Sequence, residues 1–186
     1  GKLFYKWKSS RCNKKTLMSP QTLKLLNKTA DDEWSISDHF LANVRVPPKQ
    51  LLKWVGNKQK VAPYIASILP KSYKTYIEPF VGTGAVLGAV APDKGIAGDV
   101  LKPLIDIWIL VKNSPDKLFK FYLTTWNKFV NAPKEVYSAI LKSYNDNPNP
   151  YDLLLLSRSF YWGVVRFSMQ GKLSTPIGPH RPIPPV

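Results

Sequence analysis

The chain has 186 residues, of which 44% are hydrophobic and 21% are charged, so it can bury the core of one domain and is too apolar for general disorder. Its 27 basic and 12 acidic residues give a net charge of +15, which favours a polyanionic partner, most often nucleic acid, although ribosomal and anionic-membrane partners share this signature. Cys12 is the only cysteine and excludes an internal disulfide, and His39 and His180 stand far apart, so we expect no metal site.

Nothing in the sequence predicts a membrane segment. No apolar run is long enough to span a bilayer. The basic opening GKLFYKWK leads into no apolar core, so no signal peptide is predicted. We therefore expect no membrane partner and an intracellular location, cytoplasmic or nucleoid-associated.

Residues 1–49 are predicted to form a basic N-terminal extension. The first 30 residues hold eight Lys or Arg and no acid, with Phe4, Tyr5 and Trp7 among the charges. A solvated arm and an arm that contacts phosphates are both compatible with this pattern. A short helix is predicted over 19–28 and a joint at the prolines of 46–49.

Residues 50–113 are predicted to form the first part of an α/β domain. Helical apolar spacing covers 57–70, and a strand follows over 75–80. After a glycine-rich turn come a short helix over 84–90, a strand over 94–100 and a helix over 101–112. This order of elements is typical of a doubly wound α/β sheet.

Residues 114–186 are predicted to be mainly helical. Two amphipathic helices cover 115–131 and 133–145, and a more apolar helix covers 149–163. Residues 164–178 alternate in polarity around a central glycine and predict a β-hairpin. The proline-rich residues 179–186 predict no regular structure.

The segment IEPFVGTGAV, residues 77–86, leaves a predicted strand through Gly82 and Gly84. Glycine lets a backbone approach a ligand closely, and the following helix start presents N–H groups. The segment lacks the Lys of a phosphate-binding loop, and its next glycine, Gly88, is misplaced for a dinucleotide loop. Asp99 ends the next strand, where an acid can accept hydrogen bonds from ribose hydroxyls. An adenosine-bearing ligand and a purely structural turn both remain open.

The longer segment LLKWVGNKQKVAPYIASILPKSYKTYIEPFVGTGAV, residues 51–86, resembles the opening of the Dam-type adenine-specific DNA methyltransferases. In that family a W-x-G-x-K segment and an E-P-F-x-G-x-G loop enclose S-adenosylmethionine. The resemblance implies a Rossmann-like S-adenosylmethionine-dependent methyltransferase sheet with a helical and β-hairpin target-recognition insertion. It assigns cofactor binding to Trp54, Lys58, Glu78, Phe80, Gly82, Gly84 and Asp99. The family usually has Asn two residues after the last acid, where this chain has Leu101.

The segment LLLLSRSFYWGVVRFSMQGKLSTPIGPHRPI, residues 153–183, is similar to the family's target-recognition region, in which a hairpin reaches double-stranded DNA. The resemblance implies DNA contacts for Arg166, Lys172, His180 and Arg181. A guanidinium suits such a role because it offers two donors to the major-groove edge of guanine. For each arginine, an ion pair that supports a helix or the hairpin is the alternative.

The family's Asp-Pro-Pro-Tyr motif, which holds the flipped adenine against the methyl donor, does not occur in these 186 residues. The resemblance therefore implies methyl transfer to the exocyclic amine of adenine, with this chain supplying cofactor binding and target recognition but no catalytic residue. We expect an incomplete sheet, and a second chain or a C-terminal part that carries the motif. The alternative is a catalytically inactive nucleic-acid-binding or scaffold subunit on a degenerate methyltransferase fold.

Overall fold

The computed structural model describes residues 3–8 and 50–179, which divide into two compact units. Of the described residues, the sheet unit comprises 3–8, 50 and 57–99, and the helical unit comprises 51–56 and 100–179. The helix predicted over 19–28 and the joint predicted at 46–49 lie outside the described residues. Among the helices that are described, none is both long and apolar enough to cross a membrane.

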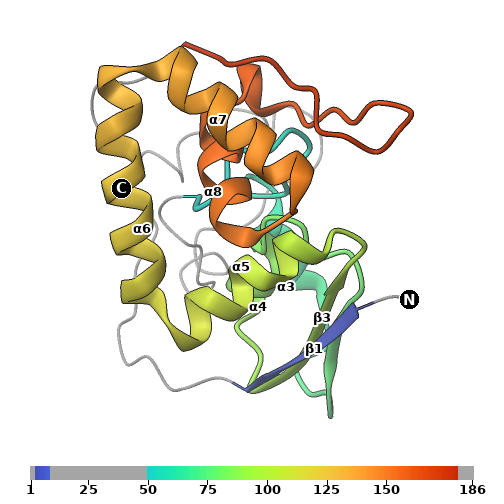
Figure 1. The fold of residues 1–186 in the computed structure, drawn as a ribbon. Helices are drawn as coiled ribbons and strands as arrows, with labels where there is room; N and C mark the ends of the chain where they lie inside the picture. The colour runs from blue at the N-terminus through green and yellow to red at the C-terminus, as the bar shows by residue number, and fades with distance from the viewer. Residues whose placement is uncertain (1–2, 9–49, 180–186) are drawn as a thin grey trace, which may run out of the picture. The chain divides into compact units, whose positions relative to one another are not determined.

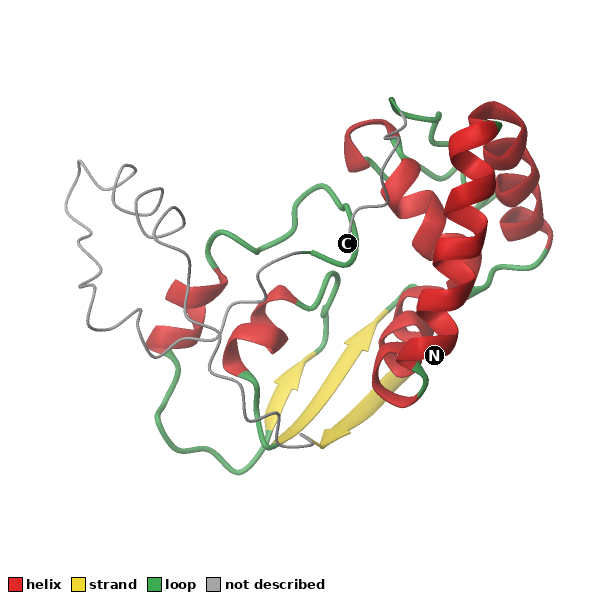
Figure 2. Cartoon of the chain, turned by 90° about the vertical axis from the view of Figure 1, so that its left-hand side faces the viewer, coloured by secondary structure: helices red, strands yellow, loops and turns green. Residues whose placement is uncertain are grey.

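The sheet unit contains three strands in the order β1-β3-β2 (Figures 1 and 2). β2 (Tyr76–Glu78) and β3 (Lys94–Asp99) are parallel and are joined through α4 (Ala85–Val90). α4 packs on α3 (Ala62–Ile68) through a small cluster of buried alanines. The small side chains at this contact allow α3 and α4 to approach closely. The predicted order of strand, helix and strand is confirmed.

The strand β1 (Leu3–Lys8) lies in a part of the sequence for which no strand was predicted. β1 runs antiparallel to β3, with Leu3 opposite Asp99 and Lys8 opposite Lys94. The segment LFYKWK is rich in aromatic residues, which favour strands, and lysines are common on strands at sheet edges. Because this segment was interpreted from its positive charge, the preference of its aromatic residues for a strand was missed.

The helix predicted over 57–70 is shorter in the structure, because α3 begins only at Ala62. The side-chain oxygen of Asn57 accepts hydrogen bonds from the Gln59 backbone N–H at 3.1 Å and from the Gln50 side chain at 2.7 Å. An Asn side-chain oxygen that accepts from the backbone N–H two residues on forms a turn that competes with helix. Pro63 lies in the first turn of α3, where proline is tolerated.

The helical unit packs its helices around one another and confirms most of the predicted boundaries (Figure 1). Its helices are α5 (Lys102–Asn113), α6 (Pro115–Asn131), α7 (Pro133–Asp146) and α8 (Pro150–Ser159). The leucines at 153–156 of α8 are all buried, so α8 is covered on every side, in keeping with its contacts to α5, α6 and α7. Stacked rings of Tyr122, Trp126 and Phe129 fill the core from α6.

The apolar helix predicted over 149–163 ends earlier, at Ser159. Phe160 is extended and forms an antiparallel bridge with Ile177, and a single 3-10 turn covers Tyr161–Gly163. Because the side chain of Phe160 is 1% exposed, its burial in the core and its backbone pairing together stop the helix. The predicted hairpin over 164–178 is present in reduced form, with one further bridge between Phe167 and Leu173.

We expect Leu155→Ala to destabilise the helical unit by about 2–5 kcal/mol, because it leaves a cavity where a fully buried side chain packs. Urea unfolding followed by tryptophan fluorescence measures this change. Lys142→Ala, at an exposed position of α7, serves as the control and should change stability by less than about 0.5 kcal/mol. Equal effects of the two substitutions would contradict the central position of α8.

Candidate functional site

The loop between β2 and α4 is fixed to the end of β3 by backbone hydrogen bonds. The Val81 N–H donates to the Gly98 carbonyl at 2.8 Å, and the Gly84 N–H donates to the Val81 carbonyl at 2.8 Å. The Val81 side chain is 4% exposed and anchors the loop in the sheet unit. The loop is therefore built as a defined turn beside the carboxyl end of β3.

Gly82 and Gly84 both adopt positive φ angles, of 48° and 67°. Residues with a Cβ adopt this conformation at a cost, so the turn favours glycine at both positions. A Cβ built at Gly82 would meet no atom within 4 Å. The space beside Gly82 is thus open, and the backbone there can be approached closely by a ligand.

Asp99, the last residue of β3, lies against this loop. Its Oδ2 accepts a hydrogen bond from the Gly82 N–H at 3.1 Å. The structure therefore brings Gly82 of the glycine loop together with Asp99, the acid that the sequence indicated, although the two residues are 17 positions apart in the chain. A carboxylate held at a strand end beside an open glycine turn can accept hydrogen bonds from the hydroxyls of a ribose.

Glu78 is half-buried at the end of β2, and its carboxylate already has protein partners. The Tyr76 hydroxyl donates to Glu78 Oε2 at 2.9 Å, and the Leu87 backbone N–H donates to the same carboxylate. Burial raises the pKa of the Glu78 carboxyl above its usual range, although both hydrogen bonds act to lower it. Tyr76 was not singled out from the sequence, because a tyrosine in an aromatic-rich strand is more often a packing residue.

The other predicted cofactor residues are placed as follows. Phe80 is 79% exposed in the loop. Lys58 is exposed, and its carbonyl accepts hydrogen bonds from Val61 and Ala62 at the start of α3. Trp54 belongs to the helical unit, where it packs against the core and where its neighbour Val55 donates to the Gly163 carbonyl at 2.9 Å.

The hairpin that follows α8 has a fixed base. Asn145 of α7 holds Leu173 with two hydrogen bonds, accepting from its N–H at 2.7 Å and donating to its carbonyl at 3.0 Å. The Tyr137 hydroxyl donates to the carbonyl of Thr175, whose own hydroxyl accepts from the Arg166 N–H. These contacts attach the hairpin to α7.

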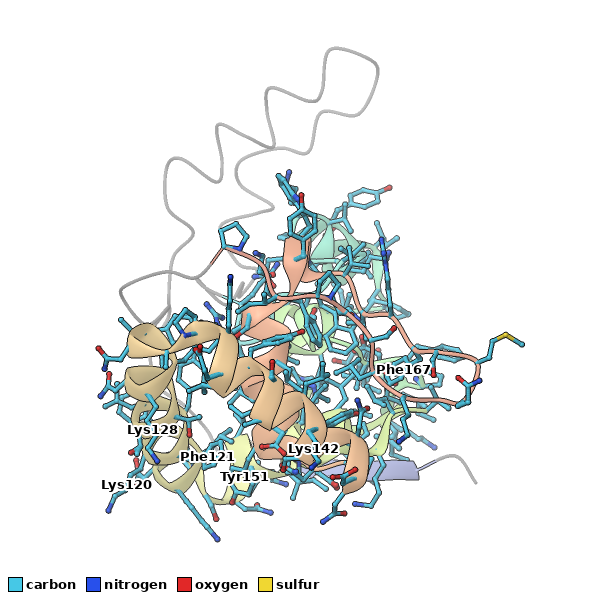
Figure 3. The ribbon with its side chains drawn as sticks, turned by 45° about the horizontal axis from the view of Figure 1, so that its top comes forward. Lys120, Phe121, Lys128, Lys142, Tyr151 and Phe167 are labelled. Carbon is cyan, nitrogen blue, oxygen red and sulfur yellow. The ribbon has the colours of Figure 1, made fainter. Side chains whose placement is uncertain are left out.

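The hairpin exposes both cations that the sequence indicated in this part of the chain, Lys172 at the turn and Arg166 on the hairpin arm below it. Arg166 and Lys172 are exposed. Phe167, labelled in Figure 3, is 45% exposed, and Met169 is fully exposed. The Ser168 N–H donates to the Lys172 carbonyl at 2.7 Å and closes the turn. His180 and Arg181 lie outside the described residues. The arrangement presents positive charge on a supported loop, which suits contact with phosphates or base edges.

Residues 54–181 match the family of D12 class N6 adenine-specific DNA methyltransferases. The chain belongs to this family. It is similar to the type II methyltransferase M.MjaIII of Methanocaldococcus jannaschii, with 30% identity over 153 residues that cover 72% of this chain and 53% of that protein. It is also similar to the DNA adenine methylases of Serratia marcescens and Escherichia coli (strain K12), each with 28% identity over 137 residues that cover 72% of this chain and 50% and 49% of those proteins.

The chain spans about half the length of the curated relatives it matches. The matched region of the family contains both the glycine loop and the described hairpin. Family membership confirms the resemblance seen in the sequence. It leaves the individual roles of the loop and hairpin residues as predictions, and the same holds for the predicted division at residues 49 and 113.

We expect Asn145→Ala to loosen the hairpin, because the N–H and carbonyl of the buried Leu173 would both lose their partner. The expected cost is about 1–3 kcal/mol of unfolding free energy. Hydrogen exchange at the Leu173 amide and urea unfolding measure the effect. Asn131→Ala is the matched control, since that exposed side chain bonds only within its own helix, to the Asn127 carbonyl. Unchanged exchange at Leu173 would show that α7 does not hold the hairpin.

Proposed function

We propose that this chain takes part in S-adenosylmethionine-dependent methyl transfer to the exocyclic amine of adenine in double-stranded DNA. Its part is to hold the methyl donor at the glycine loop and to contact DNA through the hairpin. The observation that carries the proposal is the open glycine turn at Gly82 bonded to the Asp99 carboxylate, in a chain of the adenine methyltransferase family. The parallel pair β2 and β3 would be the start of a Rossmann-like sheet.

The residues present fit the methyl donor. Positive φ at Gly82 and Gly84 lets the backbone approach the ligand, and Asp99 would accept hydrogen bonds from the ribose hydroxyls. Lys58, Phe80 and Trp54 are proposed as further contacts, and the exposed ring of Phe80 offers an apolar face. Once bound, S-adenosylmethionine supplies an electrophilic methyl group on a positively charged sulfur.

The amine of adenine is a weak nucleophile, because its lone pair is delocalised into the ring. Methylation therefore requires that the adenine be flipped out of the duplex and that hydrogen-bond acceptors contact the protons of its amine. The family's Asp-Pro-Pro-Tyr motif supplies such acceptors, and the 186 residues contain no such tetrapeptide. We propose that this motif is contributed by further polypeptide, either on the same protein or on a second chain.

A second function is a catalytically inactive module that binds DNA or serves as a scaffold. It is favoured by the strongly basic composition, which alone supports nucleic-acid binding. The two functions differ in whether the glycine loop still binds the methyl donor, because a scaffold has no use for that ligand.

Calorimetry with S-adenosylmethionine, and with its demethylated product, tests the cofactor loop. We expect Gly82→Asp to weaken binding by about tenfold or more, because a second carboxylate beside Asp99 occupies the open space and repels the first. Gly171→Asp is the matched control, since Gly171 also has a positive φ, of 73°, and open space beside it. Absence of binding to the wild-type chain, alone and with a complementing chain, would favour the scaffold.

Duplex DNA binding at several salt concentrations tests the hairpin. We expect Arg166→Ala to weaken binding. If Arg166 contacts a phosphate, the substitution should also reduce the slope of log affinity against log salt concentration by about one. Lys142→Ala removes an equal charge from the exposed surface of α7 and is the control. Equal losses from both substitutions would indicate general attraction to a basic protein and not recognition by the hairpin.

A further inference from the structure

The first turn of α4 receives no cap from the residue that precedes it. Gly84 occupies the N-cap position and provides no side-chain hydrogen bond. Its φ of 67° is the left-handed conformation that favours glycine, whereas the best caps, Ser, Thr, Asp and Asn, normally cap from extended backbone. The same geometry that keeps the loop open to a ligand therefore leaves the first N–H groups of the helix in need of another acceptor.

Glu78 supplies that acceptor from six residues before Gly84. Its carboxylate receives the N–H of Leu87, the third residue of α4. Glu78 is also the last residue of β2. One side chain thus connects the end of the strand directly with the start of the helix, so that both ends of the intervening loop are held by the same group.

Tyr76 in turn holds Glu78. The two residues are two apart on β2 and therefore lie on the same face of the strand, and the Tyr76 hydroxyl donates to Glu78 Oε2 at 2.9 Å. Their partners in register on β3 are Gly95 and Ala97, which are small and buried. The absence of bulk on β3 at these two positions leaves room for the tyrosine ring and the carboxylate on this face.

We propose that Tyr76 is a positioning residue for the glycine loop, acting through Glu78 as a remote cap of α4. This inference rests on the proposed function, in which the loop holds the methyl donor. The tyrosine hydroxyl keeps the carboxylate directed at the Leu87 N–H, and the bond to Leu87 fixes where the loop enters the helix. Glu78 then contributes to ligand binding through the loop, whereas Gly82 and Asp99 face the ligand.

The groups that act on the Glu78 carboxyl come from both neighbouring elements. The Tyr76 hydroxyl of β2 and the Leu87 N–H of α4 both donate hydrogen bonds to this carboxylate. The nearby Tyr73 contributes to raising the pKa of Tyr76. Burial and the adjacent Glu78 raise the pKa of Tyr76 well above its ordinary value. The hydroxyl therefore keeps its proton at neutral pH and remains a donor.

Tyr76→Phe removes the hydroxyl and leaves the ring in place, so it tests the positioning role with little change in packing. The matched control is Tyr73→Phe, the same change on a tyrosine that is 44% exposed and whose ring centroid is 6.4 Å from that of Tyr76. Three quantities are measured in both variants: affinity for S-adenosylmethionine by calorimetry, the carboxyl titration of Glu78 by carbon NMR, and hydrogen exchange at the Leu87 amide.

For Tyr76→Phe we expect affinity to fall by about tenfold, as for the loss of one hydrogen bond to a charged group. The midpoint of the Glu78 titration should move to higher pH, because a donor that favours the carboxylate is lost. Exchange at Leu87 should become faster. Tyr73→Phe should leave all three quantities near their wild-type values.

The outcomes separate this inference from the proposed function. If the wild-type chain binds the ligand and Tyr76→Phe matches Tyr73→Phe in all three measurements, the positioning role is refuted while the proposed function stands. If the titration and the exchange change but the affinity does not, Tyr76 supports only the helix, and the role in ligand binding is likewise refuted. If the wild-type chain binds no ligand, the proposed function fails, and the exchange at Leu87 still decides whether Tyr76 controls the cap.

Discussion

The hydrogen bond from the Gly82 N–H to the Asp99 carboxylate is the interaction on which the candidate site depends. It joins the turn that follows β2 to the end of β3, and the adjacent bond from Val81 to Gly98 keeps the two segments in place. Both bonds require that β2 and β3 be parallel and adjacent, since only then do their carboxyl ends meet at one edge. The parallel pair β2 and β3 therefore brings the loop and the acid together.

The hairpin is built on the same principle of a supported base and an open end. Asn145 and Tyr137 satisfy the backbone of the hairpin where it is buried, so the exposed tip needs no packing of its own. Met169 is fully exposed near the turn. The hairpin that we propose as the DNA contact is thus held at its base while its cations stay exposed.

Features local in the sequence, such as prolines and amphipathic patterns, predicted most of the helices. The end of α8 and the support of the hairpin were not predicted, because they depend on contacts between residues distant in the chain. Pro115 and the amphipathic pattern after it set the bounds of α6, because a proline at the first turn and a buried stripe are both local features. The end of α8 depends on a bridge from Phe160 to Ile177, and the hairpin depends on Asn145, which is 28 residues from Leu173. The glycine loop was identified by its motif, whereas the partners of Glu78 were not, since a motif records which residue is present and not what it bonds.

The distribution of charge also fits a chain that holds a cationic ligand and a polyanion. Although the net charge is +15, residues 75–93 contain no Lys or Arg and include two acids, Glu78 and Asp93. The glycine loop thus forms an interval without positive charge in an otherwise basic sequence, and Asp99 adds a carboxylate beside it. A methyl donor with a positively charged sulfur meets no lysine or arginine within that segment, whereas the lysines and arginines elsewhere attract phosphates. Charge distributed in this way along the sequence suits the two ligands proposed for the chain.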